Sequence, residues 1–99
     1  MGKRKIRIKK SASESISSVS FYIESKGLEK TAEKFSDSVY DFIEKLDSEF
    51  INYRLCREKN RAALGLKCVN FHKKYTIVFF ETEKEIIVTE FRPSKLIFW

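Results

Sequence analysis

The stretch YTIVFFETEKEIIVTEF, residues 75–91, contains two apolar segments separated by a short polar one. The first, YTIVFF, is apolar at consecutive positions, which is typical of a central strand covered on both faces. The second, EIIVTEF, follows a turn near Glu83 and Lys84, so the two segments predict an antiparallel pair of strands. Pro93 has no backbone donor and is expected to end the second strand or to lie at an edge.

The residues before this pair predict a third strand. LKCVNF precedes the turn-like HKK at residues 72–74, which completes an antiparallel meander. Residues 50–65 are less regular, with a short helical turn expected near residues 60–64 and ended by Gly65. Contact with the core is expected for Phe50, Tyr53 and Leu55.

The first half of the chain predicts one strand and two helices. KIRIKK alternates Ile6 and Ile8 with basic residues, which favours a half-buried strand over a flexible basic arm or nuclear signal. Apolar residues then recur every three or four positions on both sides of Gly27, with Ser11 or Ser13 as the expected N-cap. This spacing predicts two antiparallel helices packed as a hairpin, with their apolar stripes buried in the core. The apolar stripes comprise Ala12, Ile16, Val19, Ile23, Leu28, Ala32, Phe35, Val39, Phe42 and Leu46.

The element order predicts an α+β fold: an N-terminal strand, an antiparallel helix hairpin, and a three-stranded antiparallel meander forming one sheet packed on the helices. The 99 residues fit a single domain, 1–99. No apolar run approaches the ~18 residues of a membrane span, and the charged start lacks the apolar segment of a signal peptide. A cytoplasmic protein without a membrane partner is expected.

The two cysteines, Cys56 and Cys68, are expected to be ordinary reduced thiols. The chain has one histidine and no Cys-x-x-Cys pair, so typical zinc ligands are lacking. His72 lies in a predicted turn, where a solvated role is favoured over a catalytic one. No metal or cofactor is expected.

Charge is unevenly distributed along the chain, whose net charge is +6. Residues 1–10 carry six basic groups and no acid, whereas residues 11–50 carry nine acids against four lysines. Residues 51–99 carry ten basic groups against five acids. This asymmetry suggests a surface facing a polyanion, although basic ends that merely improve solubility remain an alternative.

Cations and aromatic residues alternate in the second half, as in nucleic-acid sites where cations hold phosphates and aromatic rings stack on bases. Strand aromatics often lie in the core instead, so this pattern alone leaves both interpretations open. The residues singled out are Tyr53, Arg57, Arg61, Lys67, Phe71, Lys73, Lys74, Tyr75, Arg92, Lys95, Phe98 and Trp99.

Taken together, KIRIKKSA, the helix hairpin, GLKCV, KKYTIVFF and EIIVTEFRPSKLIFW resemble the RelE/ParE superfamily of toxins from bacterial type II toxin–antitoxin modules. The resemblance covers nearly the whole chain in element order and length. It implies a cognate antitoxin as partner and one of two activities. RelE-like members cut mRNA on the ribosome without a metal, whereas ParE-like members inhibit DNA gyrase.

The resemblance to ribonuclease members implies a catalytic role for Lys67, Tyr75 and Arg92. Cations there would stabilise the pentacoordinate phosphate, and a phenol with a lowered pKa would carry a proton. Metal-independent, ribosome-dependent mRNA cleavage is the leading interpretation, and gyrase inhibition or a non-toxic nucleic-acid-binding module are its alternatives. The residues expected to bind nucleic acid are Arg57, Arg61, Lys73, Lys74, Lys95 and Trp99.

Two departures from the ribonuclease pattern leave the enzymatic activity open. Thr76 stands where ribonuclease members commonly have an arginine, and the terminal aromatic, Phe98 or Trp99, cannot act as an acid or base. Leu96–Trp99 are expected either to dock against the meander beside Arg92 or simply to cover apolar surface.

Overall fold

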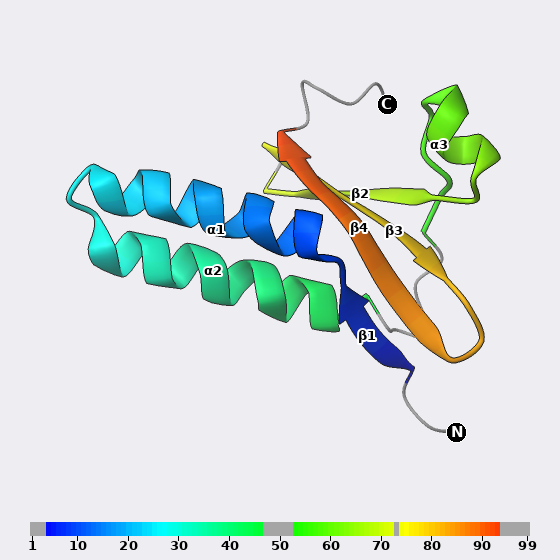
Figure 1. The fold of residues 1–99 in the computed structure, drawn as a ribbon, viewed down its shortest axis with the longest axis horizontal. Helices are drawn as coiled ribbons and strands as arrows, with labels where there is room; N and C mark the ends of the chain where they lie inside the picture. Colours follow the sequence, from blue (N-terminus) through cyan, green and yellow to red (C-terminus); the bar gives the residue numbers. More distant parts are fainter. Residues whose placement is uncertain (1–3, 47–52, 73, 94–99) are drawn as a thin grey trace.

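A four-stranded sheet forms the centre of the molecule (Figure 1). The computed structural model describes residues 4–46, 53–72 and 74–93. The strand order is β1-β4-β3-β2, with β1 parallel to β4 and the other neighbours antiparallel, so the predicted meander is confirmed. The strands are β1 (Lys5–Ile8), β2 (Lys67–Phe71), β3 (Tyr75–Glu81) and β4 (Glu85–Pro93).

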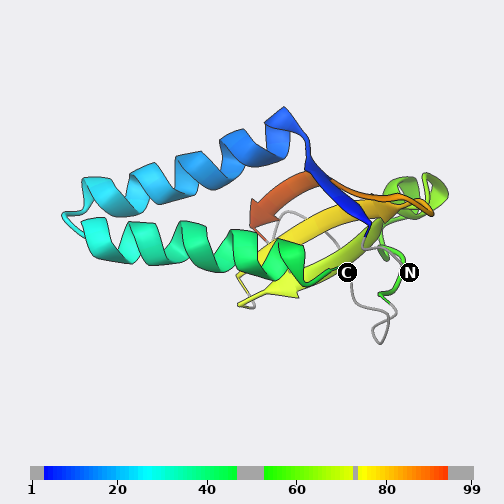
Figure 2. The same cartoon turned by 90° about the horizontal axis from the view of Figure 1, so that it is seen from below.

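Two long helices form the predicted hairpin against one face of the sheet and extend beyond it (Figures 1 and 2). They are α1 (Lys10–Ser25) and α2 (Glu29–Glu44), and a short third helix is α3 (Lys59–Ala63). Within the described residues, no helix is long and apolar enough to cross a membrane. The predicted α+β class and its element order are therefore confirmed.

The first helix begins earlier than predicted, because Lys9 and neither Ser11 nor Ser13 occupies the N-cap. The Lys9 amide donates to the Val88 carbonyl at 2.9 Å, which continues the ladder between β1 and β4 up to the helix. The Ser11 hydroxyl, already inside the helix, donates to the Thr89 carbonyl at 3.2 Å. Because the pairing of β1 with β4 continues up to Lys9 and α1 begins at Lys10, neither serine lies before the helix, where an N-cap residue must be.

The hairpin turns at Gly27, as predicted. Gly27 has a φ of +80°, in the left-handed region that glycine adopts at helix ends. Leu28 follows it and is 50% exposed, so the prediction that the whole apolar stripe is buried was wrong at this position. The tip of the hairpin lies beyond the sheet (Figure 2), so the sheet does not cover Leu28 there.

The centre of β3 is buried on both faces, as its sequence predicted. Ile77 and Phe79 belong to the large core beneath the helix hairpin, whereas Val78 packs with Cys56 and Cys68 in a smaller cluster. All three β3 residues are fully buried. Pro93 is the last residue of β4, also as predicted.

A β-bulge in β4 sets the direction of its polar side chains. Val78 is opposite Glu90 and Phe79 is opposite Val88, so Thr89 is the extra residue. The Thr89 hydroxyl donates to the Val78 carbonyl at 3.2 Å. Because of this insertion, Val88 and Phe91 both face the core and Glu90 points to the other side.

Residues 53–66, here called the arm, connect α2 to β2 and include α3. Tyr53 packs edge-on against Phe79 with ring centroids 5.5 Å apart, which confirms its predicted contact with the core. Leu55 is 52% exposed, so the same prediction was wrong for that residue, and Phe50 lies outside the described residues.

The prediction of two reduced cysteines was wrong. Cys56 of the arm and Cys68 of β2 form a disulfide, with their Cα atoms 4.8 Å apart. A spacing of twelve residues does not reveal this contact, because only the return of the arm alongside β2 brings the two sulfurs together. Leu55 forms an isolated antiparallel β-bridge with Lys67, which aligns the arm with β2.

Candidate functional site

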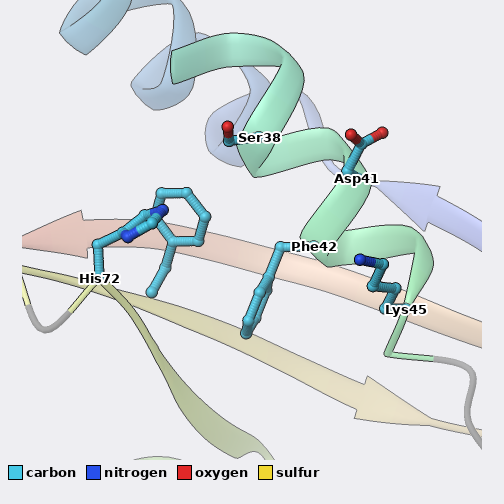
Figure 3. Close-up of a pocket in the computed structure, with 6 residues that line it drawn as sticks. Ser38, Asp41, Phe42, Lys45 and His72 are labelled. Atoms are coloured by element: carbon cyan, nitrogen blue, oxygen red, sulfur yellow. The ribbon is translucent and has the colours of Figure 1, made fainter. Parts of the chain in front are cut away.

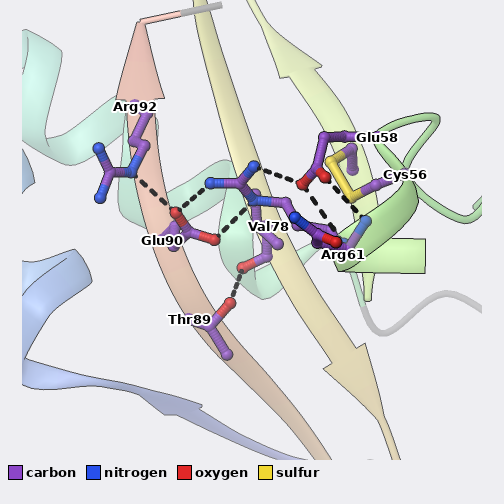
Figure 4. Close-up of a disulfide and its surroundings, with 9 residues drawn as sticks. Cys56, Glu58, Arg61, Val78, Thr89, Glu90 and Arg92 are labelled. Atoms are coloured by element: carbon purple, nitrogen blue, oxygen red, sulfur yellow. Dashed lines mark hydrogen bonds and ion pairs between the residues drawn. A yellow bond between two sulfur atoms is a disulfide. The ribbon is translucent and has the colours of Figure 1, made fainter. Parts of the chain in front are cut away.

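A cluster of charged side chains lies on the sheet face opposite the helix hairpin (Figure 4). Glu90 of β4 accepts two hydrogen bonds from Arg61, at 2.9 Å from Nε and 2.8 Å from Nη2. Glu90 also accepts one from Arg92 Nε at 2.8 Å. Arg61 in turn donates to Glu58 at 2.9 Å, and Glu58 caps α3 by accepting from the amides of Asn60 and Arg61. The cluster therefore joins β4 to the arm.

The contacts within this cluster stabilise the charged forms of Glu90 and Arg61. The hydrogen bonds from Arg61 are the main reason that the pKa of Glu90 lies below its ordinary value, and Arg92 adds to the effect. The same contacts raise the pKa of Arg61. Glu90 is thus ionised at neutral pH and is a poor general acid there.

Arg92 is the part of this cluster most open to solvent, with 51% of its side chain exposed. One nitrogen, Nε, is committed to Glu90, while a guanidinium has further donors on its terminal nitrogens. Arg57 lies exposed on the arm. Arg92 is accordingly the cation of this cluster best placed to meet a large anionic partner.

Tyr75, a predicted catalytic residue, lies on the opposite face of the sheet from Arg92. Its ring stacks on Phe91 at 5.0 Å and meets Phe35 of α2 edge-on at 5.6 Å. Tyr75 is opposite Pro93 and Thr76 is opposite Arg92, so alternation along the strands points the two side chains to different sides.

Lys67, the third predicted catalytic residue, lies toward the other end of the sheet. Phe71 is opposite Tyr75 and Lys67 is opposite Phe79, a displacement of four residues. At ~3.3 Å per residue this is about 13 Å. Lys67 donates to Glu81 at 2.7 Å, and Arg4 lies 3.6 Å from the same carboxylate. Burial, with a contribution from Glu81, raises the pKa of the nearby Tyr53.

Of the six residues predicted to bind nucleic acid, three lie within the part of the chain that the structure describes. Arg61 is tied to Glu90 and Glu58, while Arg57 and Lys74 are exposed. Lys73, Lys95 and Trp99 lie outside the described residues, as do Phe98 and the proposed docking of Leu96–Trp99. The structure therefore gathers Arg61 and Arg92 around Glu90, an acid that the sequence had not singled out.

A hollow of about 230 Å³ lies between α2 and the end of β2 (Figure 3). Its walls combine aromatic and polar side chains: Ser38, Asp41, Phe42, Lys45, Phe71 and His72. His72 is exposed, as predicted for a turn residue, and has a φ of +51°. Among the described residues, no group of three or more His, Cys, Asp or Glu side chains could hold a metal ion.

Of the comparisons with known proteins, the one with solved structures found a match. No protein-family model and no curated protein matches the sequence. A solved chain from the chromosomal ParDE TA system of P. aeruginosa is similar in structure, with a TM-score of 0.75 and 11% sequence identity. The match covers 91% of this chain and 95% of that one. At this identity the similarity establishes the fold, and it is the fold that the resemblance to the RelE/ParE superfamily implied.

Proposed function

We propose that this protein is the toxin of a type II toxin–antitoxin module. The observation that carries the proposal is the match to a chain of a ParDE TA system across 91% of the sequence. The short motifs that resemble the RelE/ParE superfamily support it independently. The basic second half, with ten cations against five acids, suits a toxin that meets a large anionic target.

Of the two activities that the resemblance implies, inhibition of DNA gyrase by binding is better supported than RNA cleavage. A ribonuclease of this kind needs its cations and its proton carrier around one phosphate. Lys67 is about 13 Å along the sheet from Tyr75 at ~3.3 Å per residue. The Tyr75 ring is packed between Phe35 and Phe91, away from Arg92. A binding surface requires no such convergence.

Ribosome-dependent mRNA cleavage remains the second candidate, because one observation favours it. Arg92 is half exposed and has terminal donors available for a phosphate. Arg57, exposed on the arm, is a further cation outside the cluster. If this activity exists, Arg92 is the residue on which it depends.

The first test is inducible expression in bacterial cells, where growth arrest is expected. Purified protein is then added to a gyrase supercoiling reaction and to a cell-free translation reaction with primer extension of the mRNA. Loss of supercoiling with intact mRNA supports the gyrase inhibitor. New cuts on translated message that disappear in Arg92→Ala, but persist in the matched control Lys45→Ala on α2, support the ribonuclease instead.

Continued growth, with both reactions unaffected, would contradict the toxin proposal. Steeply salt-dependent binding to any RNA or DNA in that case would identify a non-toxic nucleic-acid-binding module.

The proposed partner is a cognate antitoxin, which requires apolar surface for docking. Phe21 and Tyr22 are 72% and 61% exposed near the tip of the helix hairpin, close in sequence to the exposed Leu28. The Nζ atom of Lys26 lies over the Tyr22 ring, 5.2 Å from its centroid. A co-expressed antitoxin is expected to restore growth with the wild-type chain and to fail with Phe21→Ser/Tyr22→Ser.

A further inference from the structure

The arm has little apolar anchorage at its helix. The five residues of α3 include no buried side chain, and a helix this short does not persist in water without tertiary support. Leu55 and Leu64 of the arm are 52% and 75% exposed. The arm must therefore be held on the sheet mainly by other contacts.

Apolar packing anchors the two ends of the arm, Tyr53 against Phe79 and Leu66 in the cluster with Val78. Between these ends, three kinds of contact hold it. The Cys68 amide donates to the Arg54 carbonyl at 3.3 Å, which is a long hydrogen bond. Arg61 makes its two hydrogen bonds to Glu90; such a bidentate pair is stronger than an ordinary surface ion pair, but its side chains are 21% and 22% exposed, so water and salt weaken it. The third contact is the disulfide between Cys56 and Cys68, whose residues are 2% and 5% exposed and pack on Val78.

We propose that the Cys56–Cys68 disulfide is a redox-sensitive latch that keeps the arm closed over the sheet. While the bond is intact, residues 56–68 form a covalent loop whose unfolding is restricted. Once it is reduced, the remaining polar contacts are too weak to hold the arm at all times. The arm then opens, which releases Arg61 from Glu90 and uncovers Val78.

The chemistry needs a dithiol reductant. One of its thiolates attacks a sulfur of the disulfide and forms a mixed disulfide, and its second thiolate displaces the remaining cysteine. Cys56 and Cys68 each gain a proton and become thiols, while the dithiol is oxidised to a cyclic disulfide. In a reducing compartment the open form predominates, and oxidation closes the latch.

The arm contains its own reporter sites for trypsin. Arg57 and Lys59 are exposed basic residues within the loop that the disulfide closes, whereas Lys30 and Lys34 are exposed on α2 and serve as internal controls. The native protein is digested briefly with and without dithiothreitol, then denatured and fully reduced so that linked fragments separate before mass spectrometry. Reduction should speed cleavage after Arg57 and Lys59 about tenfold and leave the α2 sites unchanged.

Two variants separate the latch from the ion pair. Cys56→Ser/Cys68→Ser should be cleaved rapidly in the arm with or without dithiothreitol. Arg61→Ala, with the disulfide intact, should be cleaved in the arm at nearly the wild-type oxidised rate. Circular dichroism of each variant checks that the helix hairpin is folded.

Three results would overturn the proposal. Alkylation of the air-exposed native protein could reveal two free thiols, so that no latch exists. Cleavage in the arm could be insensitive to dithiothreitol. The α2 sites could accelerate as much as the arm sites, which would mean that the disulfide holds the whole fold rather than the arm.

Discussion

Glu90 is the residue around which the charged cluster is organised. It accepts three hydrogen bonds, two from Arg61 and one from Arg92, and so links β4 to the arm. Its direction depends on the neighbouring bulge, because in a regular strand Glu90 and Val88 would share a face. The extra residue, Thr89, turns Glu90 away from the core.

This arrangement predicts a pH dependence. The folded-state pKa of Glu90 is below its ordinary value of 4.5, so its contribution to stability is present above that pH. It is lost as the pH falls through the folded-state pKa, since the unfolded state then binds more protons. Between about pH 6 and about pH 3, the wild type should lose more stability than Glu90→Gln. Urea denaturation at both pH values measures the difference, and equal losses would contradict the prediction.

At the scale of elements, the ends of α1 are set by different kinds of contact. Its start is fixed by strand pairing, through the Lys9 amide and the Val88 carbonyl. Its end depends on the local backbone at Gly27, where a φ of +80° favours glycine. The length of α1 thus depends on one long-range hydrogen bond at its start and on one local turn at its end.

Gly27→Ala should therefore destabilise the protein by about 1 kcal/mol. A Cβ at this position meets no heavy atom within 4 Å, so the cost comes from the backbone alone. Gly27→Asn should cost less, because asparagine tolerates the left-handed region better. The midpoints of urea unfolding for both variants test this, and an unchanged midpoint for Gly27→Ala would show that the turn adopts another conformation.

At the scale of the whole molecule, the two faces of the sheet are covered unequally. The helix hairpin covers the face that carries Ile77 and Phe79, and the arm with its disulfide covers Val78 on the other. Most of the apolar burial is therefore on the hairpin side. Adjacent residues of β3 should differ strongly in their contribution to stability.

Phe79→Ala should cost about 3–5 kcal/mol, since the ring is fully buried in the large core. Phe80→Ala is the matched control, because Phe80 is only partly buried, and it should cost markedly less. A loss of the larger size is a considerable part of the ~5–15 kcal/mol typical of a folded domain. Equal destabilisation by the two substitutions, measured by thermal or urea unfolding, would contradict this picture.

Much of the fold follows from local patterns in the sequence. The period of two in KIRIKK, the spacing of three and four in the helices, and the apolar centre of β3 each indicate an element correctly. The candidate site was less predictable. Lys67, Tyr75 and Arg92 are residue types that a ribonuclease site uses. The directions of their side chains, however, depend on strand register and on the bulge at Thr89. The spacing of Ile86, Val88 and Phe91, two and then three, was the available indication of that bulge.

By itself, the sequence determined the elements and their order, because periodicity and turn residues act over a few positions. Only the tertiary structure decided which distant residues meet. The disulfide between Cys56 and Cys68 requires the arm to return beside β2, and the contacts of Glu90 require a bulge and a docked helix. The start of α1 at Lys10 depends on a hydrogen bond to a strand nearly eighty residues away. Such contacts arise from packing between elements, which no local pattern encodes.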